Sequence, residues 1–406
     1  MAGKPKVLLI VTADTKAEEA AYLRACLEEA GVDVVHMDPS VRADLGVAEI
    51  RPEEIANAAG KTIEEVRALK HEGKCQAVMM EGAIKLALDY HKKHGLSGIL
   101  SIGGSMGTTL STAVMRAFPY GFPKLMISTM ASGFTAPYVG NRDIAMLNSV
   151  VDINGLNSIA REVYRNGALA LAGMAKGFSP SRESEKPLVL MTTLGTTEKC
   201  AKRIRSRLED EGFEVMIFHS SGAGGPTLDS IAADRGAAAV IDLSLIEVSD
   251  FLKGGLAGGS PDRSKAALEA GIPTVFAPGN IDFIIAGPID AAKAQFPNRR
   301  YHIHNSALTA VRAYPDDFRE VADHMAGLIK SAKGPVSFFT PLGGLSSHDS
   351  PEGHLYEPGM ASAFAERARE VMPENVNLRE FDAHINDDVF ADAIADEVLR
   401  LTGKAA

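Results

Sequence analysis

The sequence predicts an α/β protein made of two Rossmann-like, doubly wound domains, with mainly parallel sheets and a cleft between the domains. Continuous apolar strands are followed by roughly 12–15 residues at helical spacing with a glycine just past the helix end, which is typical of parallel βαβ units. The pattern of strand, turn, helix and strand at 4–35 recurs at 186–217. The chain has 406 residues, of which 46% are hydrophobic, so each half can bury its own core.

The first half begins with an apolar strand at 7–11, followed by a hydroxyl-rich turn and an amphipathic helix at 12–30 and a strand at 32–35. Another buried strand at 98–102 enters a loop rich in glycine and hydroxyl side chains, after which helical spacing returns. At 121–128, the glycine is expected to end a helix, and the apolar residues after it are expected to form a further buried strand. In such parallel sheets, ligands bind in the loops that follow the strands.

The second half repeats this order. It has a strand at 188–190, a turn and helix, and a strand at 213–217. Further buried strands are expected at 237–241 and 272–276, the second again after a glycine. This duplication predicts a second sheet of the same kind as the first.

A stretch rich in serine, proline and charged residues lies around residue 180, as in linkers between domains. The predicted domains are therefore 1–180 and 181–406. Residues 370–406 contain one more strand and one helix, and they complete the second domain or cross back to the first.

Charge and cysteine usage exclude several classes of protein. Lys and Arg number 42 against 52 Asp and Glu, a net charge of −10, and without a basic run we expect no nucleic-acid partner. No window reaches the roughly 18 uninterrupted apolar residues of a membrane helix, so we expect no membrane partner. Cys26, Cys75 and Cys200 lie far apart and no signal peptide is recognised, which indicates a reduced, cytoplasmic protein.

The loop at 103–109 is the strongest candidate for a ligand site. Its three glycines let the backbone approach a ligand, and the following helix adds unpaired amides and the positive end of its dipole. This combination suits a phosphate or the carboxylate of a small acid, although a tight turn and helix cap is the alternative. Neither a Walker A sequence nor Gly-x-Gly-x-x-Gly occurs. The ligand-binding residues predicted in this loop are Gly103, Gly104, Ser105, Gly107, Thr108 and Thr109.

Two more loops are expected to reach the same ligand. The loop at 128–133 follows the next strand and supplies hydroxyl groups and a glycine. The turn at 12–16 places a lysine at a helix start, where a cation opposes the helix dipole unless an anion lies nearby. The ligand-binding residues predicted in these loops are Ser128, Thr129, Ser132, Gly133, Thr15 and Lys16.

The same glycine loop also matches Gly-x-Ser-x-Gly between a strand and a helix, which makes Ser105 a candidate nucleophile. A catalytic triad then needs an acid and a histidine further along the chain. The available acids are Asp242, Asp250 and Asp282, and the available histidines are His302, His348 and His384. A chain with two sheets argues against this single-sheet hydrolase arrangement.

The second half contributes carboxylates and histidines. Acidic residues at the end of the strand at 237–241 could bind Mg²⁺ or act as bases, or could be a solvated helix start. Two histidines on one face of an extended segment at 301–305 could begin a metal site, or could lie on an edge strand. The catalytic candidates are Asp242, Glu247, Asp250 and His384, and the metal candidates are Asp242, Glu247, His302 and His304.

A set of motifs in collinear order resembles the Tm-one-like ATP-binding family of bacterial and plant proteins. The motifs lie at 12–16, 101–109, 127–133, 150–155, 218–225, 303–305 and 384–387. The resemblance implies two Rossmann-like domains, a homodimer or higher homo-oligomer, and binding of ATP with Mg²⁺. It implies little about a reaction.

Together these observations predict a protein that binds ATP or another phosphorylated small metabolite in the cleft between its domains. If it is an enzyme, a Mg²⁺-assisted reaction is expected. One alternative is a hydrolase or lyase that uses Ser105 or a metal ion without a nucleotide. Another is a non-catalytic nucleotide sensor or partner-binding module.

Overall fold

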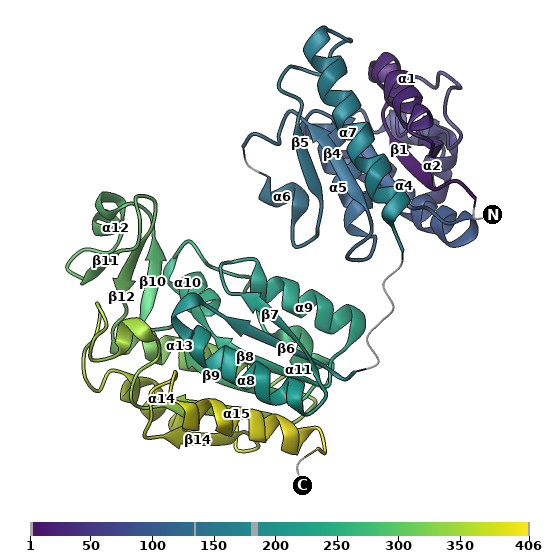
Figure 1. Cartoon of the computed structure of the whole chain (residues 1–406). Coiled ribbons are helices and arrows are strands. Elements are labelled where there is room, and N and C mark those ends of the chain that lie inside the picture. Colours follow the sequence, from purple (N-terminus) through teal and green to yellow (C-terminus); the bar gives the residue numbers. More distant parts are fainter. Residues whose placement is uncertain (1–2, 134, 180–185, 405–406) are drawn as a thin grey trace. The chain divides into compact units, whose positions relative to one another are not determined.

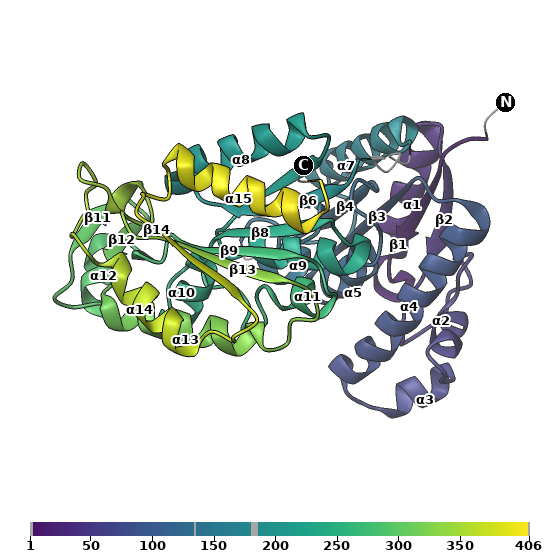
Figure 2. The ribbon, with the colours of Figure 1, turned by 90° about the horizontal axis from the view of Figure 1, so that it is seen from below.

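The structure is a computed structural model that describes residues 3–133, 135–179 and 186–404. The chain divides into two compact units, Met1–Arg182 and Glu183–Ala406 (Figure 1). Each unit is a parallel sheet with helices on both faces (Figure 2), so the predicted α/β fold class is confirmed. Residues 180–185, around which the linker was predicted, lie outside the described residues.

The first domain is built on a five-stranded parallel sheet within its described residues. Its strands are β1 (Lys6–Ile10), β2 (Asp33–Met37), β3 (Gly98–Gly103), β4 (Lys124–Ser128) and β5 (Ala145–Asn148). Their order is β2-β1-β3-β4-β5. The chain therefore moves from β1 to one side and then crosses to the other, and the order reverses between β1 and β3. Ligands bind at such a switch point in doubly wound sheets.

Helices cover both faces of this sheet because each buries an apolar stripe. Leu23 of the first helix and Tyr164 of the last pack on one face, while Met79 and Val114 pack on the other. The helices are α1 (Ala13–Glu29), α2 (Pro52–Ala58), α3 (Ile63–Ala68), α4 (Glu72–His94), α5 (Ser105–Arg116), α6 (Ala136–Val139) and α7 (Ser158–Gly177). The β3 and β4 strands are buried along their whole length, as expected for central parallel strands.

The described part of the second domain has a six-stranded parallel sheet in the order β14-β13-β9-β8-β6-β7. Its strands are β6 (Leu188–Thr193), β7 (Glu214–His219), β8 (Ala239–Ser244), β9 (Thr274–Gly279), β13 (Val336–Pro341) and β14 (Asn377–Phe381). A small antiparallel sheet, which the sequence did not predict, lies between β9 and β13 in the chain. It consists of β10 (Phe283–Ala286), β11 (Tyr301–Ile303) and β12 (Thr309–Arg312).

The helices of this domain again pack on two faces, with Ile204 and Val398 in one core and Phe318 and Phe364 in the other. They are η1 (Gly195–Thr197), α8 (Glu198–Asp210), α9 (Gly224–Arg235), α10 (Ile246–Lys253), α11 (Lys265–Glu269), α12 (Ile289–Gln295), α13 (Pro315–Ile329), η2 (Ser347–Asp349), α14 (Ala361–Val371) and α15 (Asp388–Leu401). None of the helices in the described ranges is long and apolar enough to cross a membrane.

The final strand and helix belong to the second domain. The β14 strand pairs in parallel with β13, and α15 packs beside α8. Ion pairs join these two helices, with 2.7 Å between Arg203 Nη2 and Asp392 Oδ2. Residues 377–401 therefore complete the second sheet and do not cross back.

Candidate functional site

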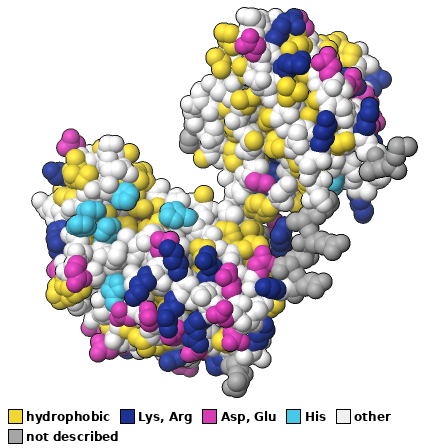
Figure 3. Space-filling view, in the orientation of Figure 1, with side chains coloured by type: hydrophobic (Ala, Val, Ile, Leu, Met, Phe, Trp, Pro, Cys, Tyr) yellow, Lys and Arg dark blue, Asp and Glu magenta, His cyan; other side chains and the backbone are white. Residues whose placement is uncertain are grey.

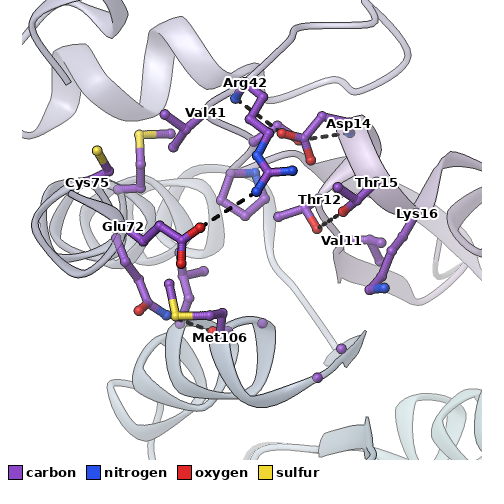
Figure 4. Close-up of a pocket in the computed structure, with 18 of the residues that line it drawn as sticks. Val11, Thr12, Asp14, Thr15, Lys16, Val41, Arg42, Glu72, Cys75 and Met106 are labelled. Carbon is purple, nitrogen blue, oxygen red and sulfur yellow. Dashed lines mark hydrogen bonds and ion pairs between the residues drawn. The ribbon is translucent and has the colours of Figure 1, made fainter. Parts of the chain in front are cut away.

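A pocket of about 530 Å³ lies at the carboxyl ends of β1, β2 and β3, at the switch point of the first sheet (Figure 4). Every residue that lines it belongs to the first domain. A ligand cleft shared by both domains stays a prediction. The pocket combines three kinds of surface: the start of α5, a charged rim and an apolar wall.

The start of α5 is formed by the predicted glycine loop. A Cβ atom on Gly103 would lie 3.0 Å from Gly107 Cα, so the turn is as tight as glycine allows. Gly104 is the N-cap, and Ser105, Met106 and Gly107 are the first residues of α5. Amides in the first turn of a helix have no carbonyl one turn earlier to bind. Together with the helix dipole, they make this end of the pocket attractive to an anion.

The neighbouring start of α1 is closed, because side chains already accept its first amides. Asp38 Oδ1 accepts from the Ala13 amide at 2.9 Å, and Ser40 Oγ accepts from the Asp14 amide at 3.1 Å. An anion in the pocket therefore meets the open start of α5, whereas the first two amides of α1 are already bound.

The rim carries charges of both signs. Arg42 Nη2 and Glu72 Oε1 are 3.6 Å apart, but both side chains are about three-quarters exposed and such pairs stabilise little. Lys16 departs from helical geometry within α1, and its ammonium donates to the Ile153 carbonyl at 2.8 Å. Lys70 has a φ of 48°, a conformation that is uncommon for residues other than glycine. Backbone strain of this kind is concentrated at functional sites.

The opposite wall is apolar and is built mainly by the first turns of α4. Cys75 and Met79 are buried there, and Val11 and Leu110 line the pocket beside them. Gln76 Nε2 donates to the Met106 carbonyl at 2.7 Å, so α4 also fixes the start of α5. The pocket therefore suits a ligand with one anionic and one apolar part.

The pocket brings together some of the predicted ligand-binding residues and not others. The residues that line it are Thr15, Lys16, Gly103, Gly104, Ser105 and Gly107. Thr108 and Ser128 are fully buried, and their hydroxyl oxygens bind each other at 2.6 Å. Thr108 Oγ1 also donates to the Gly104 carbonyl at 2.7 Å. These two hydroxyls hold the loops together and do not face the pocket.

The remaining predicted hydroxyls also lie outside the pocket lining. Thr109 Oγ1 donates to the Ser105 carbonyl at 2.9 Å within α5. Thr129 lies beside Gly104, where a Cβ on the glycine would be 3.8 Å from its hydroxyl oxygen. Ser132 and Gly133 are exposed in the loop after β4. Only a displacement of these loops would bring the last two residues to a ligand in the pocket.

Ser105 lacks the setting of a hydrolase nucleophile. A nucleophile elbow holds its serine in a strained turn, but Ser105 begins α5 and is not among the described residues with positive φ. Within the described ranges its hydroxyl makes no hydrogen bond to a histidine. The exposed hydroxyl can donate to a ligand, and His71, which lines the same pocket, accepts from the Lys74 amide and not from Ser105 among the described residues.

The carboxylates predicted in the second domain hold a buried arginine. Arg263 Nε lies 2.8 Å from Glu247 Oε2, and its Nη2 lies 2.9 Å from Asp242 Oδ1. The amides of Gly222 and Gly225 also donate to Glu247, at 2.8 Å and 3.0 Å. Burial lowers the pKa of the guanidinium, but the charges of Asp242, Asp229 and Glu247 outweigh it and raise this pKa above its ordinary value. Both carboxylates are therefore already paired and are not free to bind a metal ion.

Asp250 lies near this cluster but is not part of it. Its carboxylate accepts from the Ala257 amide at 2.9 Å and from the Ile285 amide at 3.2 Å. Burial raises the pKa of Asp250 to about 7. The raised pKa is one that a general acid needs, but the Asp250 side chain is fully buried and cannot reach a ligand.

Of the predicted histidines, His302 and His348 lie together, with ring centroids 4.9 Å apart, and His384 is held elsewhere. His384 Nε2 lies 2.9 Å from the Ser346 carbonyl and its Nδ1 accepts from the Asn386 amide, so both ring nitrogens are engaged. His302 stacks on His354, with ring centroids 4.1 Å apart, while His304 is exposed.

Figure 3 shows histidine side chains gathered on the second domain, and burial together with neighbouring imidazoles lowers the pKa of His302. Across the described ranges, no three His, Cys, Asp or Glu side chains are arranged to hold a metal ion. The metal candidates therefore receive no support from the geometry.

Sequence reasoning missed the residues that α4 and the loop after β2 bring to the pocket. Among them are Arg42 after β2, Lys70 and His71 just before α4, and Glu72, Cys75 and Gln76 in its first turns. They form no motif, and their only common signal is a position just after a strand or at the start of a helix. Because a long connection separates β2 from β3, the sequence does not show that these residues lie near the glycine loop.

Two domain models of one protein family together match most of the chain. The N-terminal domain model of "Uncharacterised protein family (UPF0261)" matches residues 5–180, and the C-terminal domain model matches residues 186–402. The chain belongs to the UPF0261 family.

Relatives match this UPF0261 chain over nearly its whole length. A UPF0261 protein of Clostridium tetani is 36% identical, and the match covers 98% of this chain and 99% of that protein. A UPF0261 protein of Brucella suis is 34% identical, with 96% and 94% covered. The tomato (Solanum lycopersicum) ToMV resistance protein Tm-1(GCR237) is 30% identical over 99% of this chain and 56% of its own length. The resemblance to the plant Tm-1 proteins is confirmed, and ATP binding stays a prediction.

Solved structures add little to this family assignment. A UDP-N-acetylglucosamine 2-epimerase from Rickettsia bellii covers 98% of the UPF0261 chain and 96% of its own, with 12% identity and a TM-score of 0.23. A TM-score this low carries no argument about function.

Proposed function

We propose that this chain binds ATP, or another phosphorylated metabolite with an apolar part, in the first-domain pocket. One observation carries the proposal: the open start of α5 and the apolar wall of α4 face the same pocket of about 530 Å³. The open amides suit phosphate oxygens, and the wall suits a base or another apolar group. Pockets of this size hold small-molecule ligands and cofactors.

The rim supports the anionic end of this ligand. Lys16, Arg42 and Lys70 bring positive charge to the pocket, and Arg42 and Lys70 are exposed side chains that can turn toward a phosphate. Asp14 and Glu72 are the carboxylates in the lining. Mg²⁺ is commonly held by one or two carboxylates together with substrate phosphates, so this donor set fits a nucleotide that arrives with Mg²⁺. The ion would neutralise part of the phosphate charge.

The test separates the backbone of the glycine loop from its side chains. Ser105 is the first residue of α5 and Gly104 before it is extended, so Ser105→Pro removes one amide at a position where helices favour proline. Ser105→Ala, the matched control, removes only the hydroxyl. Calorimetric titration of ATP, with and without Mg²⁺, should show about tenfold weaker binding for the proline variant and a change within about threefold for the alanine variant.

Circular dichroism and thermal unfolding of both variants should match the parent protein. Unchanged ATP affinity in the proline variant would exclude the amide cradle. An equal loss in both variants would assign binding to the hydroxyl. If ATP fails to bind and a hydrolytic activity disappears in Ser105→Ala, the serine hydrolase alternative is favoured over the nucleotide site.

A further inference from the structure

We infer that the second domain has a separate binding site for a small metabolite with several negatively charged oxygens, from phosphate or carboxylate groups. A cavity of about 620 Å³ lies at the carboxyl ends of β6, β13 and β14. Its lining consists of polar and charged residues and one glycine. The cavity belongs entirely to the second domain, so the inference does not depend on the ATP pocket of the first.

Side-chain hydrogen bonds hold three walls of this cavity in fixed positions. Asn386 Nδ2 donates to the Thr196 carbonyl at 2.9 Å, and its Oδ1 accepts from the Cys200 amide at 3.3 Å. These bonds join the loop after β14 to the turn after β6. The imidazole of His384 lies 2.9 Å from the Ser346 carbonyl, which joins the loop after β14 to the loop after β13. Sites that bind ligands gain affinity when their walls are preorganised in this way.

Backbone strain marks the same place. Asn280, after β9, has a φ of 65°, and its Nδ2 donates to Thr196 Oγ1 at 2.6 Å. Asparagine adopts this left-handed conformation more readily than most residues other than glycine, and here its side-chain bond to Thr196 holds it in place. Asn280 thereby fixes the turn that forms one wall of the cavity.

Two glycines form a second close-packed loop, at 343–344, that the motif analysis did not single out. Gly344 has a φ of 134°, and a Cβ there would lie 2.2 Å from the Asp349 carbonyl oxygen and 2.6 Å from the His384 ring. Gly343 would clash in the same way with Ala383 and His384 backbone atoms. Only glycine fits at these positions, and the tight loop presents Ser347 and Ser350 to the cavity.

The lining carboxylates Glu198 and Asp387 already accept from Lys202 and from the His384 amide, and the other charged groups of the cavity can recognise oxyanions. Lys199 and Lys202 are three residues apart on α8, so their ammonium groups extend from one face of that helix. They are about two-thirds exposed, and their ion pairs, at 3.5 Å with Asp388 and 3.0 Å with Glu198, stabilise little. Within the described residues the Ser347 hydroxyl has no hydrogen-bond partner. Two cations and a free hydroxyl favour a phosphate or carboxylate ligand over a neutral one.

The experiment uses the full chain and two probes, inorganic pyrophosphate and citrate, titrated calorimetrically at low ionic strength. In the test variant, Lys199→Gln and Lys202→Gln are combined. The control combines Lys293→Gln and Lys330→Gln, which remove the same charge from exposed positions of this domain outside the cavity. We expect one molecule of at least one probe to bind per chain, with at least tenfold weaker binding in the test variant and a change within about twofold in the control.

Stronger binding of pyrophosphate than of citrate assigns the site to phosphate groups, and the reverse assigns it to carboxylates. Equal weakening in both double variants would show general charge attraction and overturn the site. Absence of saturable binding of both probes would overturn it as well. Arg42→Gln, in the first-domain pocket, should weaken only probe that binds in that pocket and should leave the binding that depends on Lys199 and Lys202 unchanged. If that variant abolishes binding, the anion binds in the first domain and the second site is excluded.

Discussion

The two domains repeat one topology, but their corresponding loops are used differently. In the first domain the crevice between β1 and β3 is a pocket. In the second, the corresponding strands β6 and β8 are joined by a hydrogen bond of 2.7 Å from Thr192 Oγ1 to Asp242 Oδ1. The turn after β6 is tied further by Thr197 Oγ1, which donates to Asn280 Oδ1 at 3.2 Å. The protein's own side chains thus occupy the switch point of the second sheet.

The glycine loops show the same contrast. The amides at the start of α5 are open to the pocket, whereas the Gly222 and Gly225 amides donate to Glu247, from the helix after β8. The amides of the second glycine loop are therefore occupied by a carboxylate of the chain, whereas those at the start of α5 are left for the proposed ligand. Three experiments test this difference, in order of decreasing expected effect.

Arg263→Met should cause the largest loss of stability. Asp242 and Glu247 are fully buried, and among the described residues Arg263 is the cation that forms ion pairs with them. The variant would leave both carboxylates buried without this partner. Breaking a buried ion pair by removing one partner costs about 3–5 kcal/mol of the free energy of unfolding. Urea denaturation measures the loss. Arg42→Met is the control, and as a substitution at an exposed pair it should change stability by less than about 1 kcal/mol. Similar results for both variants would refute the contrast.

An alanine substitution should destabilise the protein in the glycine loop of the second domain but not in the glycine loop of the first. A Cβ on Gly225 would lie 1.7 Å from Arg263 Nε and 2.0 Å from Glu247 Oε2, so Gly225→Ala should cost about 3 kcal/mol by overpacking. A Cβ on Gly107 would meet only the Ile102 carbonyl oxygen, at 3.7 Å. Gly107→Ala should therefore be neutral or stabilise α5 by up to about 1 kcal/mol. Thermal and urea unfolding compare the two, and a comparable loss in Gly107→Ala would contradict the open loop.

Asp250 should make the second domain less stable as the pH rises. Burial raises its folded-state pKa to about 7 from an ordinary value of 3.8, so the folded protein holds this proton more tightly than the unfolded chain. Stability from this group is full below pH 4 and declines as the pH rises toward 7. Between pH 5 and pH 7, the parent protein should lose about 2 kcal/mol relative to Asp250→Asn.

Urea denaturation at the two pH values gives this difference. The control is Asp262→Asn, whose carboxyl is 66% exposed and should show no such relative change. A pH dependence that is the same in the parent protein and in Asp250→Asn would rule out Asp250 as its source.

Much of the fold was predictable because it depends on local patterns. The buried strands are continuous apolar segments, and the strand predicted at 7–11 is β1 within one residue at each end. The edge strand considered at 301–305 is β11, but the rest of the small antiparallel sheet was missed because β10 and β12 have four residues each, too short for a period to appear. The helices between β2 and β3 were not assigned individually; α2 and α3 span only two turns each, but α4 has 23 residues, so length explains only the first two.

The site was less predictable, because it depends on partners that are distant in the sequence. The loop with Gly103 and Ser105 was found from its composition, but Arg42 and Cys75 reach it from the long connection between β2 and β3. Thr108 looked like a ligand donor, yet its hydroxyl turns inward to Ser128, 20 residues away. Packing decides where a side chain points and whether the chain itself occupies an amide, and composition does not reveal either.

Cys75 gives the first-domain pocket a chemical handle. All three cysteines are buried, but only Cys75 among the described cysteines lines the pocket, so fragments that displace its thiol from the Val66 carbonyl should tether at this position. A library of such fragments could map which chemical groups the neighbouring surfaces retain, even before the natural ligand is identified. Mass spectrometry of the labelled protein would identify the fragments that attach to this thiol.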